Sequence, residues 1–162
     1  MNAIKSYFLV SQDISLPETL RLWPPLPIAD RECVKSFTIQ PSKAGEKPVH
    51  LNKGDVIWVP TIAIHRDAGY YPNPSVFDPE RFNEENRSKI EPCSYIPFGI
   101  GPRSCIGSRF ALMEIKILFF HLLDKFQLVT IEKTQIPLKI LKGSMNVVTE
   151  KGIWVGFKRR EL

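Results

Sequence analysis

Cysteine is scarce in this sequence, and its three cysteines, Cys33, Cys93 and Cys105, form no Cys-x-x-Cys pair. A disulfide framework needs paired cysteines, and a structural zinc site needs ligands at close spacing. The odd number and the wide spacing therefore disfavour both kinds of site and favour a reducing compartment. We expect Cys33 and Cys93 to be small buried residues, which is the usual state of a free cysteine.

Long apolar runs are also lacking. A membrane span needs about 20 apolar residues, whereas the apolar stretch from Ile4 to Val10 is short and is interrupted by Lys5 and Ser6. No signal peptide is visible at the N-terminus. We therefore expect no membrane anchor within these residues.

The sequence lacks a large excess of charge of either sign. The net charge of the 162 residues is +5 at pH 7, and the lysines and arginines are spread along the chain. The densest basic run, Lys158-Arg159-Arg160 at the C-terminus, has no interleaved aromatic residues. It therefore predicts a solvated tail and not a nucleic-acid interface. The apolar fraction of 43% is ordinary for a folded protein.

One cysteine has unusual neighbours. Cys105 lies between Gly101 and Gly107, two residues after Arg103, and just before a predicted helix over 109–123. Helix N-termini and nearby cations lower the pKa of a thiol, so Cys105 is the thiol most easily ionised. The glycines allow a sharp turn or the close approach of a flat ligand. An inert buried cysteine is the alternative, but it does not account for these neighbours.

The spacing Phe-x-x-Gly-x-Arg-x-Cys-x-Gly, from Phe98 to Gly107, resembles the haem-ligand loop of the cytochrome P450 superfamily with no specified position substituted. The resemblance implies that Cys105 is the axial ligand of the iron of haem b. It also implies that Arg103 contacts a haem propionate, that Phe98 packs near the proximal haem face, and that Gly101 and Gly107 shape the loop.

A second resemblance concerns a pair of charged residues near the N-terminus. Glu18 and Arg21 look like the Glu-x-x-Arg motif of the family, and residues three apart share one face of a helix. The run Phe77 to Phe82 looks like the family's Pro-Glu-Arg-Phe element. The resemblance implies that Glu18 and Arg21 clasp Arg81, as a structural unit with no chemical role. A solvated surface pair is the alternative for Glu18 and Arg21 alone.

Arg31 and the three histidines carry weaker signals. In microsomal members of the family, the position of Arg31 holds an arginine that pairs with a haem propionate, a role that suits a guanidinium; otherwise Arg31 is a surface charge. His65 lies in a segment that matches the family, but no second ligand lies at metal-binding spacing. We interpret His65, and likewise His50 and His121, as packing or hydrogen-bonding residues.

Apolar patterns and turn residues predict the secondary structure. The helix over 109–123 is apolar on nearly all sides and should be buried on most faces. Residues 49–51 and 56–59 should pair as a hairpin around Gly54, and residues 70–97 should form an irregular meander with at most short helical turns. Further β-prone segments are 34–40, 128–131, 138–141, 147–149 and 153–155.

The resemblance implies an α+β segment of the mainly helical cytochrome P450 fold. It covers residues 18–162, as the C-terminal part of a P450 domain whose distal half is absent, and leaves residues 1–17 unmatched. Because proline disrupts a helix interior, the helix of Glu18 should begin at Pro17 or break there. Residues 134–139 resemble the microsomal drug- and toxin-oxidising groups, including those of insects.

The implied activity is that of a haem-thiolate monooxygenase, which inserts one atom of O2 into an apolar small molecule. Electrons would come from NADPH through NADPH–cytochrome P450 reductase, at the cytosolic face of the endoplasmic reticulum membrane, to which the full-length relatives are anchored. Six residues match segments that line the substrate pocket: Leu26, Pro27, Ile28, Ala29, Ser144 and Met145.

Two alternatives remain open. Because the family's distal helix handles oxygen and protons and would lie before Glu18, the chain alone can be a catalytically inactive fragment, or a haem-binding or interaction module. We expect the isolated chain to fold poorly and to show no turnover, since its apolar helix would lack cover. A peroxide-rearranging member of the family is disfavoured, because the ligand loop of such proteins departs from the common pattern.

Overall fold

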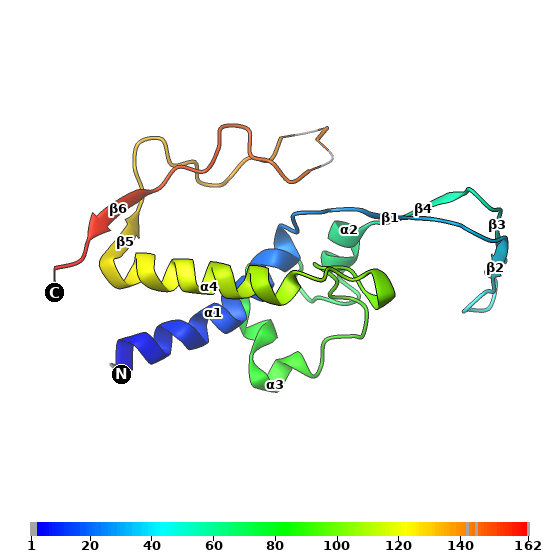
Figure 1. The fold of residues 1–162 in the computed structure, drawn as a ribbon, viewed down its shortest axis with the longest axis horizontal. Helices are drawn as coiled ribbons and strands as arrows, with labels where there is room; N and C mark the ends of the chain where they lie inside the picture. The colour runs from blue at the N-terminus through cyan, green and yellow to red at the C-terminus, as the bar shows by residue number, and fades with distance from the viewer. Residues whose placement is uncertain (1–2, 142, 145, 162) are drawn as a thin grey trace.

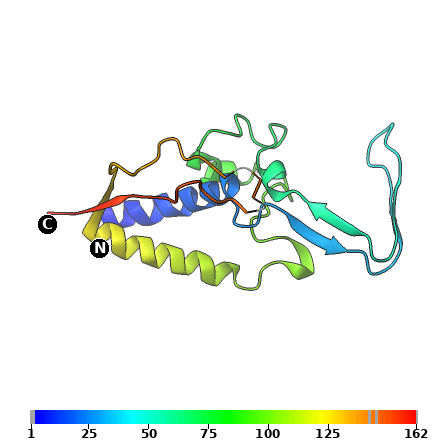
Figure 2. The ribbon, with the colours of Figure 1, turned by 90° about the horizontal axis from the view of Figure 1, so that it is seen from above.

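Two long helices form the body of the molecule in this computed structural model, which describes residues 3–141, 143–144 and 146–161. Helix α1 (Ala3–Leu22) and helix α4 (Ser108–Lys125) lie against each other and run in opposite directions (Figures 1 and 2). An ion pair between Lys116 and Asp13 joins them. No helix within the described ranges is both long enough and apolar enough to span a lipid bilayer.

The position of Pro17 corrects one prediction. Helix α1 neither begins nor breaks at Pro17 but continues through it to Leu22. Pro17 has no N–H for the helical ladder, and in the same turn the Thr19 hydroxyl donates to the Ser15 carbonyl at 2.8 Å. Among residues 12–22 of α1, whose burial the structure describes, the buried ones, Leu22 among them, follow the proline. Tertiary packing of this last turn therefore outweighs the local cost of the proline.

The segment from residue 29 to residue 59 forms one long bent hairpin, so the predicted pairing of 49–51 with 56–59 is wrong. Strand β1 (Ala29–Glu32) pairs with β4 (Val56–Val59), and β2 (Phe37–Ile39) pairs with β3 (Val49–Leu51). Ala29 pairs with Val59, and Phe37 pairs with Leu51. Phe37 lies eight residues after Ala29, and Leu51 lies eight residues before Val59, so the two ladders continue one register.

The turn around Gly54 exists, with φ of +93° at this glycine, but it bends the hairpin and does not close it. The amide of Gly54 donates to the carbonyl of Cys33 at 2.7 Å, and the amide of Cys33 donates to the carbonyl of Asp55 at 2.8 Å. The chain reverses instead within the turn-rich segment 40–48. In Figure 1 this hairpin extends away from the helical body.

Residues 60–107 form a largely irregular segment, which confirms the predicted meander. It contains only short helices: α2 (Thr61–His65), the 3-10 helix η1 (Pro79–Phe82), α3 (Glu84–Arg87) and the 3-10 helix η2 (Gly101–Arg103). Side chains cap two of them, since Asp78 accepts from the Glu80 amide and Asn83 accepts from the Asn86 amide. Helix η1 packs against α1, which draws the meander onto the end of that helix.

The C-terminal segment crosses back over the helices as a loose antiparallel ribbon (Figure 1). Strand β5 (Phe126–Val129) pairs with β6 (Gly156–Arg159), and an isolated bridge joins Ile140 to Thr149. Of the four strands predicted in this C-terminal segment, residues 128–131 overlap β5, and 138–141 and 147–149 meet at the bridge. Residues 153–155 are not a strand.

The buried core is small and lies around the end of α1. Among the described residues, the buried side chains of the core apolar residues share this one region of the structure: Leu20, Leu22, Tyr71, Phe82 and Ile96. Helix α4 differs, because none of its residues is buried within the described part of the chain. Phe110 and Leu118 are 63% and 53% exposed. The prediction of a helix buried on most faces is therefore wrong for this chain, because its neighbours cover only part of the helix.

Candidate functional site

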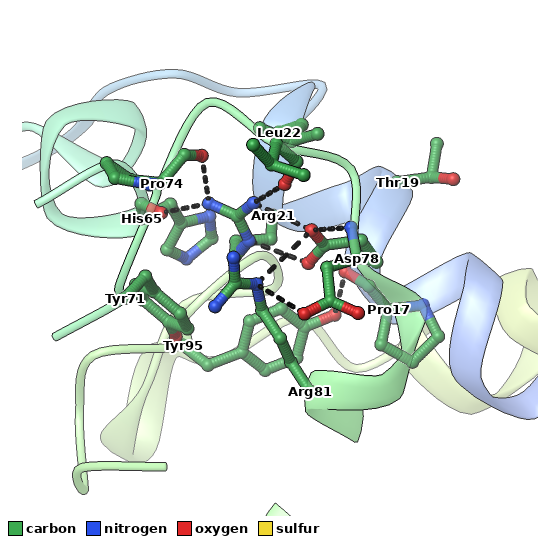
Figure 3. A network of polar contacts seen from close by, with 12 residues as sticks. Pro17, Thr19, Arg21, Leu22, His65, Tyr71, Pro74, Asp78, Arg81 and Tyr95 are labelled. Atoms are coloured by element: carbon green, nitrogen blue, oxygen red, sulfur yellow. Dashed lines mark hydrogen bonds and ion pairs between the residues drawn. The ribbon is translucent and has the colours of Figure 1, made fainter. Parts of the chain in front are cut away.

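The side chain of Arg21 is the centre of the buried polar network. It lies on the last turn of α1, and Nε and Nη2 each donate to one carboxylate oxygen of Glu18 at 2.7 Å. Nη1 donates to the carbonyls of His65 and Pro74, both at 2.8 Å (Figure 3). Nη2 also donates to the carbonyl of Val76 at 3.2 Å. A guanidinium has five N–H donors, so all five are satisfied.

Glu18 is fully buried and also faces the meander. Its Oε1 accepts from the amide of Asp78 at 2.9 Å and lies 3.7 Å from Nε of Arg81. Arg81 is 12% exposed, donates from Nη2 to the carbonyl of Asn73, and pairs with the Asp78 carboxylate at 3.9 Å. The structure thus brings Glu18, Arg21 and Arg81 together. Figure 3 shows Arg21 and Arg81 side by side. We call these three residues the clasp.

His65, at the end of α2, is fully buried next to the clasp. Its Nε2 accepts from the amide of Ile96 at 2.8 Å, and its ring stacks on Tyr95 at a centroid distance of 5.4 Å. Burial, with a smaller contribution from the positive charge of Arg21, lowers the pKa of His65 to about 4. His65 is thus a neutral packing and hydrogen-bonding residue at neutral pH, as its sequence context predicts.

Two tyrosines complete the network, and sequence patterns do not single out either of them. Tyr71 packs its ring 5.1 Å from the guanidinium of Arg21, and its hydroxyl bonds to Ser94. Tyr95 donates to the carbonyl of Pro17 at 3.1 Å, and burial raises the pKa of both tyrosines. Aromatic residues in a proline-rich meander lack the periodicity by which a buried face is recognised; only the tertiary structure assigns them.

The segment Phe98–Gly107, which we call the cysteine loop, lies between the meander and α4. The amide of Cys105 donates to the carbonyl of Phe98 at 2.8 Å, and Gly101 has φ of +77°, a conformation that favours glycine. Cys105 is exposed, Phe98 is half-buried, and Gly107 is the residue that precedes the first turn of α4. A Cβ added at Gly101 or Gly107 would meet no atom within 4 Å.

Both arginines predicted to contact propionates are exposed. Arg103 lies in η2 of the cysteine loop. Arg31 lies on β1, opposite Ile57, and donates to the carbonyl of Asp30 at 2.6 Å. The start of β1 and the cysteine loop lie at the same end of the helical body in both views (Figures 1 and 2).

The residues predicted to line a substrate pocket do not form one enclosed site. Pro27 is buried and its carbonyl accepts from the amide of Ile62, Leu26 is exposed, and Ile28 and Ala29 are half-buried. Ser144 is exposed, and Met145 lies outside the described residues. The cavity of about 310 Å³ between α1 and α4 is lined by other residues.

The remaining cysteines and histidines lie away from this network. Cys93 is exposed and Cys33 is only half-buried, so the expectation that both are buried is wrong. Both lie in irregular segments, where little packs over a side chain. His50 bonds through Nδ1 to the Thr38 hydroxyl, and His121 contacts Phe120. No cluster of three metal-ligating side chains occurs among the residues that the structure describes.

Comparison with known proteins gives the family of this chain. The model of the family "Cytochrome P450" matches residues 13–157. Cytochrome P450 9e2 of Blattella germanica is 49% identical over 148 residues, which cover 91% of this chain and 27% of the relative. Probable cytochrome P450 9f2 of Drosophila melanogaster is 44% identical over 143 residues, covering 88% of this chain and 27% of the relative.

A mammalian relative, cytochrome P450 3A9 of Rattus norvegicus, is 43% identical over 133 residues, which cover 82% of this chain and 25% of the relative. The chain thus spans about a quarter of the length of the curated relatives that it matches. The family match covers most of the chain, including the clasp and the cysteine loop. The chain therefore belongs to the cytochrome P450 family.

Proposed function

We propose that this chain supplies the thiolate-ligand region of a haem-thiolate monooxygenase, with Cys105 as the axial ligand of the haem iron. The observation that carries the proposal is the exposed Cys105 thiol just before α4, in a loop tied by the bond from the Cys105 amide to the Phe98 carbonyl. A hydrogen-bonded loop holds the sulfur at one place while leaving it accessible.

The residues of the loop fit a haem in chemistry and in shape. A single cysteine sulfur is the donor that haem-thiolate proteins use, and the space beside Gly101 and Gly107 is open, so a flat macrocycle can approach the backbone. Arg103 and Arg31 are exposed cations that would pair with the haem propionates. Phe98 would pack near the proximal face.

The whole protein would insert one atom of O2 into an apolar small molecule, with electrons from NADPH through NADPH–cytochrome P450 reductase, at the endoplasmic reticulum membrane. When bound, the haem supplies the oxygen-activating chemistry. Residues of this chain would hold the cofactor by its sulfur and propionate contacts and exclude water from its proximal face. Side chains of residues 26–29, with Ser144 and Met145, would contribute to the wall of the substrate pocket.

The clasp has a structural role in this proposal. Glu18 and Arg21 are fully buried, and removal of one partner of a buried ion pair leaves an uncompensated charge. Through Asp78, Pro74 and Val76 the clasp fixes the backbone of the meander that leads to the cysteine loop. It therefore acts on the position of the loop and does not take part in chemistry.

The test uses a chimera in which residues 13–157 replace the matching segment of the Blattella germanica relative. We expect the chimera to give the thiolate signature in its reduced, carbon-monoxide-bound spectrum, and Cys105→Ala to abolish it. Cys93→Ala is the matched control, since Cys93 is also an exposed free thiol. Survival of the signature in Cys105→Ala would refute the proposal.

A second candidate is that the 162 residues alone are an inactive fragment or a haem-binding module. The exposed apolar side chains of α4 favour it, because exposed patches of this kind promote association. Expression of residues 1–162 alone, with measurement of solubility, haem stoichiometry and NADPH-dependent product formation in the presence of reductase, tests this candidate. A soluble monomer that turns over a substrate would overturn it.

A further inference from the structure

The imidazole of His65 links the clasp to the cysteine loop. Its backbone carbonyl accepts from Nη1 of Arg21 at 2.8 Å, and its Nε2 accepts from the amide of Ile96 at 2.8 Å. Both contacts are buried. One residue therefore connects the end of α1 to the end of the meander, although the bond to Ile96 spans 31 positions of the sequence.

The connection continues along the backbone to the cysteine. The amide of Gly99 donates to the carbonyl of Ile96 at 3.0 Å, which closes a turn, and the amide of Cys105 donates to the carbonyl of Phe98 within that turn at 2.8 Å. The position of Cys105 thus depends on the turn 96–99. Among the described residues, His65 is the side chain that accepts from the amide of Ile96.

The direction of the bond assigns the protonation state of the imidazole. Because Nε2 accepts a hydrogen bond from an amide, the single ring proton of the neutral form lies on Nδ1. Nδ1 is buried and has no hydrogen-bond partner among the described residues. A second proton could enter only at Nε2, where it would break the bond to Ile96.

On balance the surroundings of the ring oppose a positive charge. Burial disfavours the protonated imidazole, and the positive charge of Arg21 adds to this effect, whereas backbone groups of Arg21 and Leu20 act in the opposite direction. Arg66 is the next residue, and the ring of Tyr95 stacks on the imidazole. No carboxylate bonds to the ring within the described part of the chain. The pKa of His65 is accordingly lowered to about 4.

We propose that His65 is a positioning residue for Cys105, which as a neutral imidazole holds the turn 96–99 and releases the cysteine loop when it is protonated. The proposal rests on the proposed role of Cys105 as the haem ligand. It goes beyond that role because it names the group on which the geometry of the loop depends and predicts that acid detaches the loop.

The test compares two substitutions in the chimera. His65→Gln can place a carbonyl oxygen near the site of Nε2 but does not titrate, whereas His65→Phe keeps a ring that can stack on Tyr95 but cannot accept from Ile96. The exposed His50→Gln is the matched control. Two readouts are followed from neutral pH down to about pH 3: the thiolate signature of the carbon-monoxide complex and the hydrogen exchange of the Ile96 amide.

We expect the unsubstituted chimera and His50→Gln to lose both the signature and the protection of Ile96 as the pH falls through about 4. We expect His65→Gln to keep both to lower pH. His65→Phe should increase the exchange of Ile96 about tenfold or more already at neutral pH, because it leaves a buried N–H without an acceptor. If His65 acted in packing alone, the hydrogen exchange of Ile96 would be unchanged in His65→Phe.

Two results would overturn the proposal: unchanged exchange of Ile96 in His65→Phe, or the same acid response in His65→Gln as in the unsubstituted chimera. Failure of the proposed function gives a different result, namely no thiolate signature in the unsubstituted chimera. In that case the exchange of Ile96, which needs no haem, still decides whether His65 holds the turn.

Discussion

The clasp and the cysteine loop both adjoin the meander, yet the side chains of the clasp are largely buried and those of the loop are largely exposed. Every N–H of the Arg21 guanidinium is bonded to a group of this chain, and Glu18 is fully buried. The thiol of Cys105 and the side chain of Arg103 are exposed. The clasp therefore has its partners within the chain, whereas the loop presents its functional groups outward.

This contrast separates two kinds of polar residue. A buried charge with a full set of bonds contributes to the fold, and its loss leaves its partners uncompensated. An exposed thiol two residues from an exposed arginine contributes little to the fold and is available to a ligand. Substitutions in the clasp should therefore change stability strongly, whereas those in the loop should change ligand binding with little effect on stability.

The largest effect is expected from Arg21→Ala in the chimera. It removes two bonds to Glu18 and three to backbone carbonyls, and leaves Glu18 with Arg81 at 3.7 Å as its remaining cation. We expect a cost of about 3–5 kcal/mol, measured from the urea midpoint. Arg31→Ala is the matched control and should change stability by less than about 0.5 kcal/mol. Equal changes in stability from the two substitutions would contradict the proposed difference between the buried clasp and the exposed cations.

A smaller effect is expected from Arg81→Ala. Arg81 is partly exposed, and Glu18 keeps both bonds from Arg21 when Arg81 is removed. We expect a loss of about 1–3 kcal/mol, and a loss in the Arg21→Ala/Arg81→Ala double variant that is less than the sum of the two. Strict additivity in this double-mutant cycle would show that the clasp is not one unit.

The pH dependence of stability should show the buried state of His65. Its pKa is lowered to about 4 in the folded chain, against the ordinary value of 6.5, so the unfolded state binds more protons between these values. Stability should therefore fall as the pH is lowered from 6.5 to about 4, by at most about 1.4 kcal/mol for each pH unit from His65. Above pH 6.5 His65 should add nothing to the pH dependence of stability. Urea midpoints are measured against pH for the unsubstituted protein and for His65→Gln, and the difference between their two pH slopes gives the contribution of His65. Identical slopes would contradict the prediction.

The smallest effect is expected from a substitution of an exposed apolar residue on α4. Leu118 on α4 is 53% exposed in this chain, so Leu118→Gln removes little buried area. In the 162-residue chain we expect a stability change within about 0.5 kcal/mol together with higher solubility. A large loss of stability in the isolated chain would mean that α4 is covered there, for example by association of copies.

Sequence patterns predicted much of the local structure and indicated the family. The composition of residues 70–97 predicted a meander, because proline and asparagine interrupt both helical and strand ladders, and the structure confirms it. The apolar run over 109–123 lies within α4. The cysteine loop and the Glu-x-x-Arg spacing indicated the family that the comparison confirmed. Each of these signals is local, since it depends on neighbouring residues alone.

Tertiary structure decided which groups meet. The pairing of β1 with β4 and of β2 with β3 replaced the local hairpin around Gly54, since register depends on both strands at once. Packing of the last turn of α1 kept Pro17 inside a helix. Arg21 bonds to the carbonyls of Pro74 and Val76, and His65 bonds to the amide of Ile96. Backbone groups are the same at every position of a sequence, so only the folded chain selects the ones that become partners.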